Sequence, residues 1–185
     1  LGHWPLTDAE LAHVLRILLQ HHPRAIGVDL YRDFPIPPGT EELQTVVTSN
    51  PHIVMVMKAS DDAEPGVAPP RWLKESEQVG FSDTLVDFDG VVRRGLLFLG
   101  DQGRTWYAFA LRLALLFLQE KNISPGHDVT IPEHLRLGPT TIRPLRTNDG
   151  GYVGMDAGGY QFLLDYQEAP ESFPSLSLST LLTEP

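Results

Sequence analysis

Residues 25–57, AIGVDLYRDFPIPPGTEELQTVVTSNPHIVMVM, contain two short apolar runs on either side of an amphipathic segment. The runs Ala25–Leu30 and Ile53–Met57 have the composition and length of strands that are buried on both faces of a sheet. Between them, apolar residues recur at helical spacing within Thr40–Ser49. The order strand, helix, strand predicts a right-handed parallel crossover, which is the repeating unit of α/β folds.

The elements outside this stretch continue the same alternation. Thr7-Asp8-Ala9-Glu10 is a capping box, and it predicts a helix that runs to about His21. Val79–Phe81 reads as a brief strand, and Thr105–Glu120 is the most apolar of the predicted helices. Further expected elements are strands at Val129–Ile131, Thr141–Ile142 and Tyr160–Leu164 and a last helical turn at Ser177–Leu182. The predicted class is α/β, with a mainly parallel or mixed sheet flanked by helices.

The segment Leu85–Phe98, LVDFDGVVRRGLLF, admits two interpretations. An Asp-x-Asp-Gly motif after a strand is where haloacid-dehalogenase-like phosphatases carry a nucleophilic aspartate and Mg²⁺ ligands, which here would be Asp87 and Asp89. An Asp-Gly pair between two β-favouring runs is also a strong hairpin signal. The only later Gly-Asp pair nearby, Gly100-Asp101, leaves no room for the phosphatase's intervening elements. The sequence therefore favours a hairpin at Asp89-Gly90.

Composition excludes several classes of function. The chain has 185 residues, a net charge of −10 and no cysteine, so one domain is expected, nucleic acid is not an expected partner, and disulfides are excluded. His21-His22 lacks a third ligand at metal-binding spacing, so no metal site is predicted. No cofactor-binding motif or catalytic triad is present, and no catalytic residue is predicted. Trp106–Leu118, the most apolar run, is too short to span a bilayer.

Four blocks of the sequence resemble one family of sensory domains in residues and in order. The blocks are Ala25–Asp33, Phe81–Arg94, Tyr107–Leu118 and Gly159–Tyr166. Together they resemble the CHASE type 2 domains (CHASE2), which are extracytoplasmic sensory modules of bacterial receptor kinases and cyclases. The family usually closes with a strand of the type Lys-x-Val-x-Ile-Gly, so the sheet of this chain is expected to lack that strand.

The resemblance implies a sensory role and no catalysis. Residues 1–185 are then a single sensory domain excised from a larger membrane signalling protein, on the extracytoplasmic or periplasmic side of the inner membrane. The implied partners are an unknown small-molecule ligand and, in the same chain, transmembrane helices and a cytoplasmic histidine kinase, adenylate cyclase or diguanylate cyclase. A homodimer is left open. An intracellular α/β protein-interaction module also stays open, because only the flanking sequence distinguishes it.

The candidate ligand site is argued from the expected sheet. Ligands of open α/β sheets bind outside the carboxyl ends of the strands. The candidate ligand-binding residues are Asp29, Tyr31, Arg32 and Asp33, which follow the first strand, with Arg93 and Arg94 on the hairpin. Carboxylates and a phenol suit a cationic or hydroxylated ligand. Asp29 has a second interpretation, as a cap that accepts backbone hydrogen bonds. Arg93 and Arg94 alternate along their strand, so one of them faces the site and one is expected to pair with an acidic residue.

Overall fold

The computed structural model describes residues 4–60, 65–74, 76–101, 103–166 and 173–183. Its centre is a parallel sheet of three strands in the order β1-β2-β3, with β1 at Ile26–Val28, β2 at Ile53–Met57 and β3 at Val79–Phe81. Every residue of β2 is buried, as expected for a strand covered on both faces. The parallel strand, helix, strand order predicted from residues 25–57 is confirmed.

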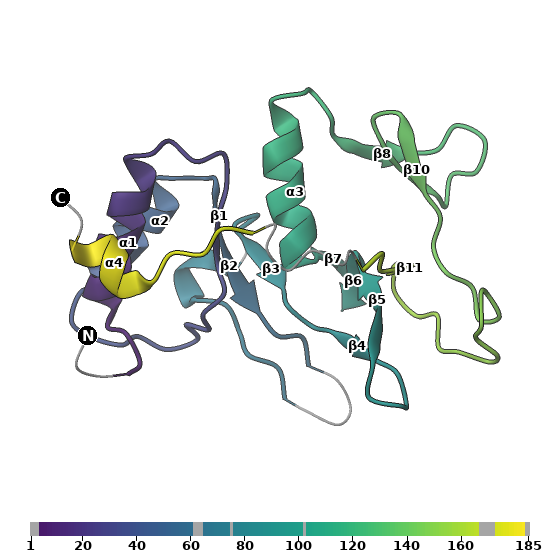
Figure 1. Cartoon of the computed structure of the whole chain (residues 1–185), viewed down its shortest axis with the longest axis horizontal. Coiled ribbons are helices and arrows are strands. Elements are labelled where there is room, and N and C mark those ends of the chain that lie inside the picture. The colour runs from purple at the N-terminus through teal and green to yellow at the C-terminus, as the bar shows by residue number, and fades with distance from the viewer. Residues whose placement is uncertain (1–3, 61–64, 75, 102, 167–172, 184–185) are drawn as a thin grey trace.

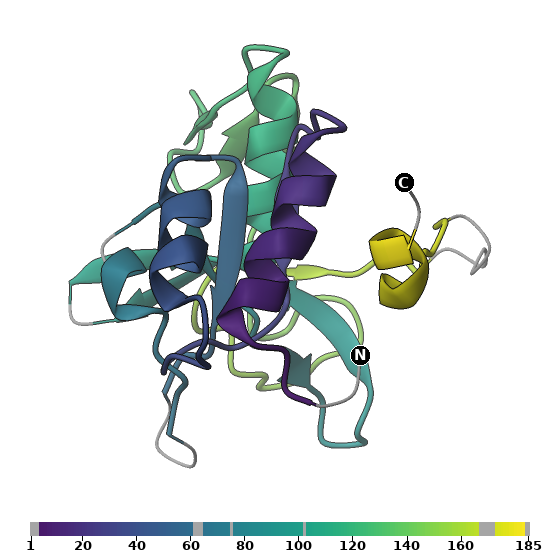
Figure 2. The same cartoon turned by 90° about the vertical axis from the view of Figure 1, so that its left-hand side faces the viewer.

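Helices α1 (Asp8–Leu19) and α2 (Thr40–Thr48) pack together on one side of this sheet (Figures 1 and 2). The capping box is present as predicted, because the Thr7 side chain accepts a hydrogen bond from Glu10 N and the Glu10 carboxylate accepts one from Thr7 N. Gly39 precedes α2 with a φ of 98° and lies against Ala9, where a Cβ would come within 2.4 Å of the Ala9 nitrogen. Glycine at position 39 therefore lets the two helices start side by side.

Helix α3 (Phe109–Gln119) covers the other side of the sheet (Figure 1). The sequence predicted that this helix starts at Thr105, and that prediction is wrong: Arg104–Tyr107 forms strand β7, which pairs with β6 at Phe98–Asp101. Thr105, Trp106 and Tyr107 are residue types that favour strands, and their main-chain groups pair with β6. An isolated bridge from Ala108 to Phe81 then joins β7 to β3.

The hairpin at Asp89-Gly90 is confirmed. Strand β4 (Leu85–Val86) pairs with β5 (Val92–Leu96), and β11 (Gln161–Leu163) adds to the free edge of β5 in the order β11-β5-β4. Gly90 has a φ of 81°, and its nitrogen donates a hydrogen bond to Asp87 O at 2.8 Å. The strand predicted at Tyr160–Leu164 thus takes part in the same antiparallel sheet.

A further sheet of three strands consists of β8 (Pro125–His127), β9 (Leu135–Leu137) and β10 (Thr140–Ile142), and Leu135 of β9 packs into the core. The strand predicted at Val129–Ile131 is absent, because Asp128 Oδ1 accepts hydrogen bonds from the nitrogens of Thr130 and Ile131 and bends the chain into a turn.

Two short helical segments complete the described chain. They are a 3₁₀ turn, η1, at Arg71–Leu73 and a last helix, α4, at Leu178–Thr183, which makes a small contact with α1. None of the helices in the described residues combines the length and the hydropathy needed to cross a bilayer.

Candidate functional site

Asp8, the first residue of α1, has a carboxylate that joins three segments of the chain. The residue is only 1% exposed. Its Oδ2 accepts hydrogen bonds from the Ile36 nitrogen at 3.0 Å and from the Thr40 hydroxyl at 2.8 Å. Main-chain bonds run alongside, from Asp8 N to Ile36 O at 2.7 Å and from Ala9 N to Pro38 O at 2.8 Å. Asp8 therefore ties the start of α1 to the loop after β1 and to the start of α2.

Arg32, on the loop after β1, is buried beside this carboxylate at 7% exposure. Its Nη2 donates to Leu6 O at 2.8 Å and its Nη1 donates to Tyr31 O at 3.1 Å. The third nitrogen, Nε, lies 3.4 Å from Asp8 Oδ1. Among the described residues, Arg32 Nε and Asp8 Oδ1 form no hydrogen bond, although both atoms are buried. Buried polar atoms without hydrogen-bond partners are rare and cost free energy. The Asp8–Arg32 pair therefore has hydrogen-bonding capacity that the fold leaves unused.

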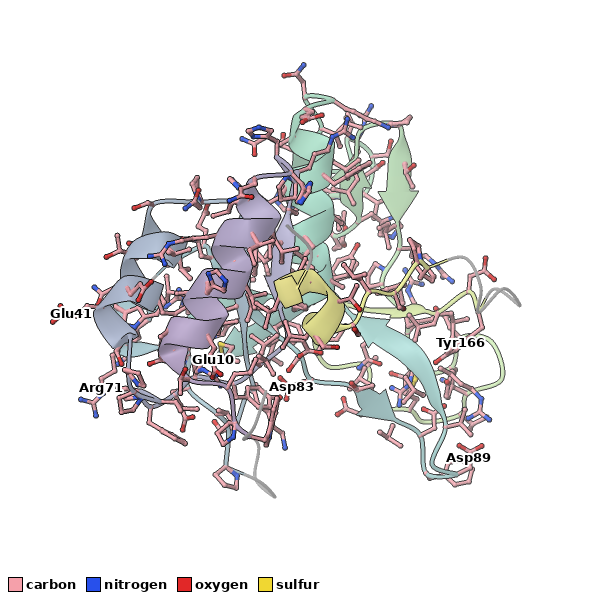
Figure 3. All side chains as sticks on the ribbon, turned by 60° about the vertical axis from the view of Figure 1, so that its left-hand side comes forward. Glu10, Glu41, Arg71, Asp83, Asp89 and Tyr166 are labelled. Carbon is pink, nitrogen blue, oxygen red and sulfur yellow. The ribbon has the colours of Figure 1, made fainter. Side chains whose placement is uncertain are left out.

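A pocket of about 280 Å³ opens next to the ion pair. Its lining comes from α1, the loop after β1, α2 and the η1 turn, and comprises Asp8, Arg32, Asp33, Phe34, Pro35, Thr40, Leu43, Pro70, Arg71 and Trp72. Figure 3 shows Arg71 at the end of the helices where this pocket lies. The lining combines apolar and aromatic walls with two carboxylates and two guanidinium groups. Such a mixture of apolar surface and a few placed polar groups is typical of small-molecule sites.

The carboxyl ends of the parallel strands, where the sequence predicted the site, hold polar groups that bond to one another. The Tyr31 hydroxyl lies 2.9 Å from Ser82 Oγ, and Asp83 Oδ2 accepts a hydrogen bond from Ala59 N at 2.9 Å. A cavity of about 360 Å³ beside Lys58 and Trp106 adjoins this edge. Asp29 is exposed there and accepts no hydrogen bond from the described residues, so it does not cap the following turn.

A second charged cluster surrounds Asp87 at the base of the hairpin. Asp87 Oδ1 accepts hydrogen bonds from Arg94 Nη2 at 2.7 Å and Nε at 2.9 Å. Its Oδ2 accepts from the Tyr152 hydroxyl at 2.8 Å and from Arg93 Nη1 at 3.1 Å. Arg93 also holds Asp89 through two hydrogen bonds, of 2.7 and 2.8 Å. Both arginines therefore pair with acidic residues, whereas the sequence argument expected this of one, because their side chains are long enough to reach the same carboxylate from neighbouring positions.

The cluster holds both carboxylates in the ionised form. Burial disfavours the charge on Asp87, but hydrogen bonds from Tyr152, Arg94 and Arg93 outweigh it, and its pKa lies below the ordinary value of 3.8. Hydrogen bonding to Arg93 lowers the pKa of Asp89 to about 2. Because both oxygens of Asp87 are occupied within an antiparallel hairpin, its carboxylate acts as a structural anchor, which disfavours the phosphatase interpretation of Asp87 and Asp89.

The structure divides the predicted site residues between separate places. Arg32 and Asp33 line the pocket, whereas Asp29 and Tyr31 do not. Arg93 and Arg94 lie on β5, and Figure 3 shows Asp89 at the tip of that hairpin, far from Arg71. The sequence argument did not single out Asp8, Phe34, Arg71 or Trp72 as site residues. The capping box placed Asp8 at the start of a helix, but nothing in the sequence indicates that its carboxylate is buried.

Comparison with protein-family models matches residues 1–185 to the CHASE2 domain. The chain therefore belongs to the CHASE2 family, a family of extracellular sensory domains in receptor proteins, as the four sequence blocks predicted. No curated protein and no solved structure matches the chain. Within the described residues, no group of three or more His, Asp or Glu side chains is placed to hold a metal ion.

Proposed function

We propose that residues 1–185 form the signal-input domain of a bacterial transmembrane receptor, on the periplasmic side of the inner membrane, and that the pocket beside Asp8 and Arg32 receives a small ligand. Membership of a sensory family supports the general role. The observation that carries the choice of site is the buried Asp8–Arg32 pair, whose facing atoms have no hydrogen-bond partner among the described residues. At the carboxyl ends of the strands, by contrast, Tyr31 and Asp83 already have partners.

The position of the pocket suits signalling as well as binding. A sensor responds only if its ligand binds one of two conformations more tightly than the other. Besides the η1 turn, the walls of this pocket belong to α1, α2 and the loop between β1 and α2, and Asp8 joins these three. A ligand that changes the contacts of Asp8 therefore acts on the relative placement of the two helices.

Thermal unfolding of the 185-residue domain, with and without members of a small-molecule collection, tests this site. A ligand at a hundredfold excess over its Kd is expected to stabilise the fold by about 2.7 kcal/mol. Phe34→Ala removes a side chain that lines the pocket and is 63% exposed, so the variant should fold but lose the stabilisation. Phe88→Ala is the matched control, because Phe88 is fully exposed at the distant hairpin. A ligand that stabilises Phe34→Ala as strongly as the wild type would show that it binds elsewhere.

Substitutions at the remaining candidate residues are tested by the same thermal unfolding measurement. Asp33→Asn is expected to weaken binding, because Asp33 lines the pocket. Asp29→Asn and Tyr31→Phe report whether the ligand extends to the carboxyl ends of the strands. Arg93→Gln and Arg94→Gln should leave ligand affinity unchanged once any loss of stability is taken into account, since both arginines serve the Asp87 cluster.

The membrane context is tested by the sequence that flanks residues 1–185. A receptor of this kind requires hydrophobic spans of about 20 residues. It also requires a cytoplasmic output domain, for which a histidine kinase, an adenylate cyclase and a diguanylate cyclase are the candidates. Flanks without hydrophobic spans would favour the intracellular interaction module instead.

A further inference from the structure

The two ions at the base of the pocket are each anchored by contacts that do not involve the other. Asp8 is held through Oδ2, by Ile36 N and the Thr40 hydroxyl. Arg32 is held through its two terminal nitrogens, by the carbonyl oxygens of Leu6 and Tyr31. The atoms that face each other, Asp8 Oδ1 and Arg32 Nε, are the ones left without hydrogen bonds among the described residues. The contact between these two atoms is therefore the part of the pair that a ligand can replace.

Replacing this contact restricts the charge that a ligand must carry. A ligand with a single positive charge would satisfy Asp8 but leave Arg32 as a buried, unpaired ion, and an anion would do the reverse. Leaving one member of a buried pair without its partner is strongly unfavourable. A ligand that carries both charges exchanges one ion pair for two, so that no buried charge is left uncompensated.

We infer that the ligand of the Asp8–Arg32 pocket is a small zwitterion, with its ammonium group on Asp8, its carboxylate on Arg32 and a compact apolar body. This inference rests on the proposed function of the pocket. The rim repeats the charge pattern of the base, with Asp33 and Arg71. The volume of about 280 Å³ lies just below the usual range for ligand pockets and suits a compact molecule.

The walls fit the same class of molecule. Phe34 and Trp72 supply aromatic surface, and Leu43 supplies aliphatic surface. Aromatic faces attract ammonium groups as well as apolar groups, so they favour the cationic end and the body of such a ligand. A strongly polar body without an apolar face would leave these walls uncovered.

The test compares molecules that share a body and differ in charge. Calorimetric titration of the domain is carried out with the standard amino acids, and each one that binds is compared with its decarboxylated amine and its deaminated acid. For L-phenylalanine these are 2-phenylethylamine and 3-phenylpropanoate. Either single-charge analogue is expected to bind about a hundredfold more weakly, or worse, because it strands one buried ion. An amine or acid that binds as tightly as its parent amino acid would overturn the inference, while loss of that binding in Phe34→Ala would leave the proposed site intact.

Substitutions of Asp8 and Arg32 provide a second test of the inference. The double variant Asp8→Asn with Arg32→Gln removes both charges together, so it strands neither and is expected to fold, but it should no longer bind the zwitterion. If the double variant does not fold, Arg71→Gln at the exposed rim takes its place and should weaken zwitterion binding, with the exposed Arg146→Gln as the control. Unchanged affinity in the folded variant would overturn the inference. So would a failure of every amino acid to bind while an uncharged or singly charged molecule binds in a Phe34-dependent manner.

Discussion

Asp89 at the hairpin tip has a carboxyl whose pKa lies well below its ordinary value. Arg93 holds its carboxylate through two hydrogen bonds and lowers its pKa from 3.8 to about 2. A carboxyl whose pKa is lower in the folded state than in the unfolded state stabilises the fold above the unfolded value. This contribution is therefore complete above about pH 4 and is lost as the pH falls toward 2.

The carboxyl ¹³C resonance of Asp89 is expected to titrate near pH 2, and the thermal midpoint of the domain should fall as the pH drops from about 4 to 2. Arg93→Gln should return the titration of Asp89 toward its ordinary range, near 3.8. An Asp89 midpoint near 4 in the wild-type domain would mean that Arg93 does not hold it in solution.

Individual site residues differ in how far the sequence could predict them. Arg32 and Asp33 were candidates because they follow a buried strand, and they line the pocket. Asp8 was not a candidate, because an acidic residue in the first turn of a helix gives the same local pattern whether it faces solvent or the interior. Tyr152 lies in a glycine-rich loop, and no local pattern indicates that it reaches Asp87 across 65 positions of the chain.

At the scale of the elements, the contact of α3 with the sheet depends on a glycine in β3. A Cβ on Gly80 would lie 2.5 Å from Phe109 Cα and 2.7 Å from Phe109 N, at the start of α3. These are backbone atoms, so they cannot rotate away as a side chain can. The glycine therefore sets how closely the helix approaches β3.

Gly80→Ala is expected to lower the free energy of unfolding by about 1–3 kcal/mol, because the start of α3 must move away from β3. Urea denaturation followed by circular dichroism measures this change. Gly100→Ala is the matched control, since Gly100 also lies in a strand and a Cβ there meets no atom within 4 Å. Equal effects of the two substitutions would show that β3 and α3 are less closely packed than described.

The elements that the sequence predicted well are those whose local pattern and tertiary surroundings agree. The sequence predicts the ends of the strands β1, β2 and β3 and of the helices α1 and α2 to within about two residues, since their apolar residues face one shared core. The sequence assigns the residues of β7 to α3, because one apolar run continues from β7 into α3. Only the pairing of β7 with β6 shows that these residues form a strand. Strand β8, which starts at Pro125 and contains Gly126, has no apolar alternation, and its pairing with β9 defines it.

At the scale of the whole molecule, burial divides the chain into a stable centre and a weakly covered periphery. All five residues of β2 are buried, whereas all three residues of β8 are exposed. Segments with few buried apolar contacts open with lower free energy than the core. The division predicts that stability is unevenly distributed along the chain.

Hydrogen exchange followed by mass spectrometry should find the slowest exchange in β2, the strand paired on both edges, and much faster exchange in the β8–β9–β10 sheet. Binding of a zwitterion should slow exchange more in residues 32–40 than in the β8–β9–β10 sheet, because residues 32–40 contain residues that line the pocket or bond to Asp8. Uniform exchange across all the sheets would instead mean that the domain opens as one cooperative unit.

The lining of the Asp8–Arg32 pocket contains no residue of any strand. Its side chains come from α1, α2, the loop after β1 and the η1 turn, and among them Leu43 also belongs to the core that the strands β1 to β3 share with the helices. Substitutions at the exposed residues Phe34 or Arg71 therefore alter the shape and charge of the pocket without changing the core. The exposed part of the lining is free to vary while the core is kept, and a chain built in this way is able to evolve toward a new stimulus one loop at a time.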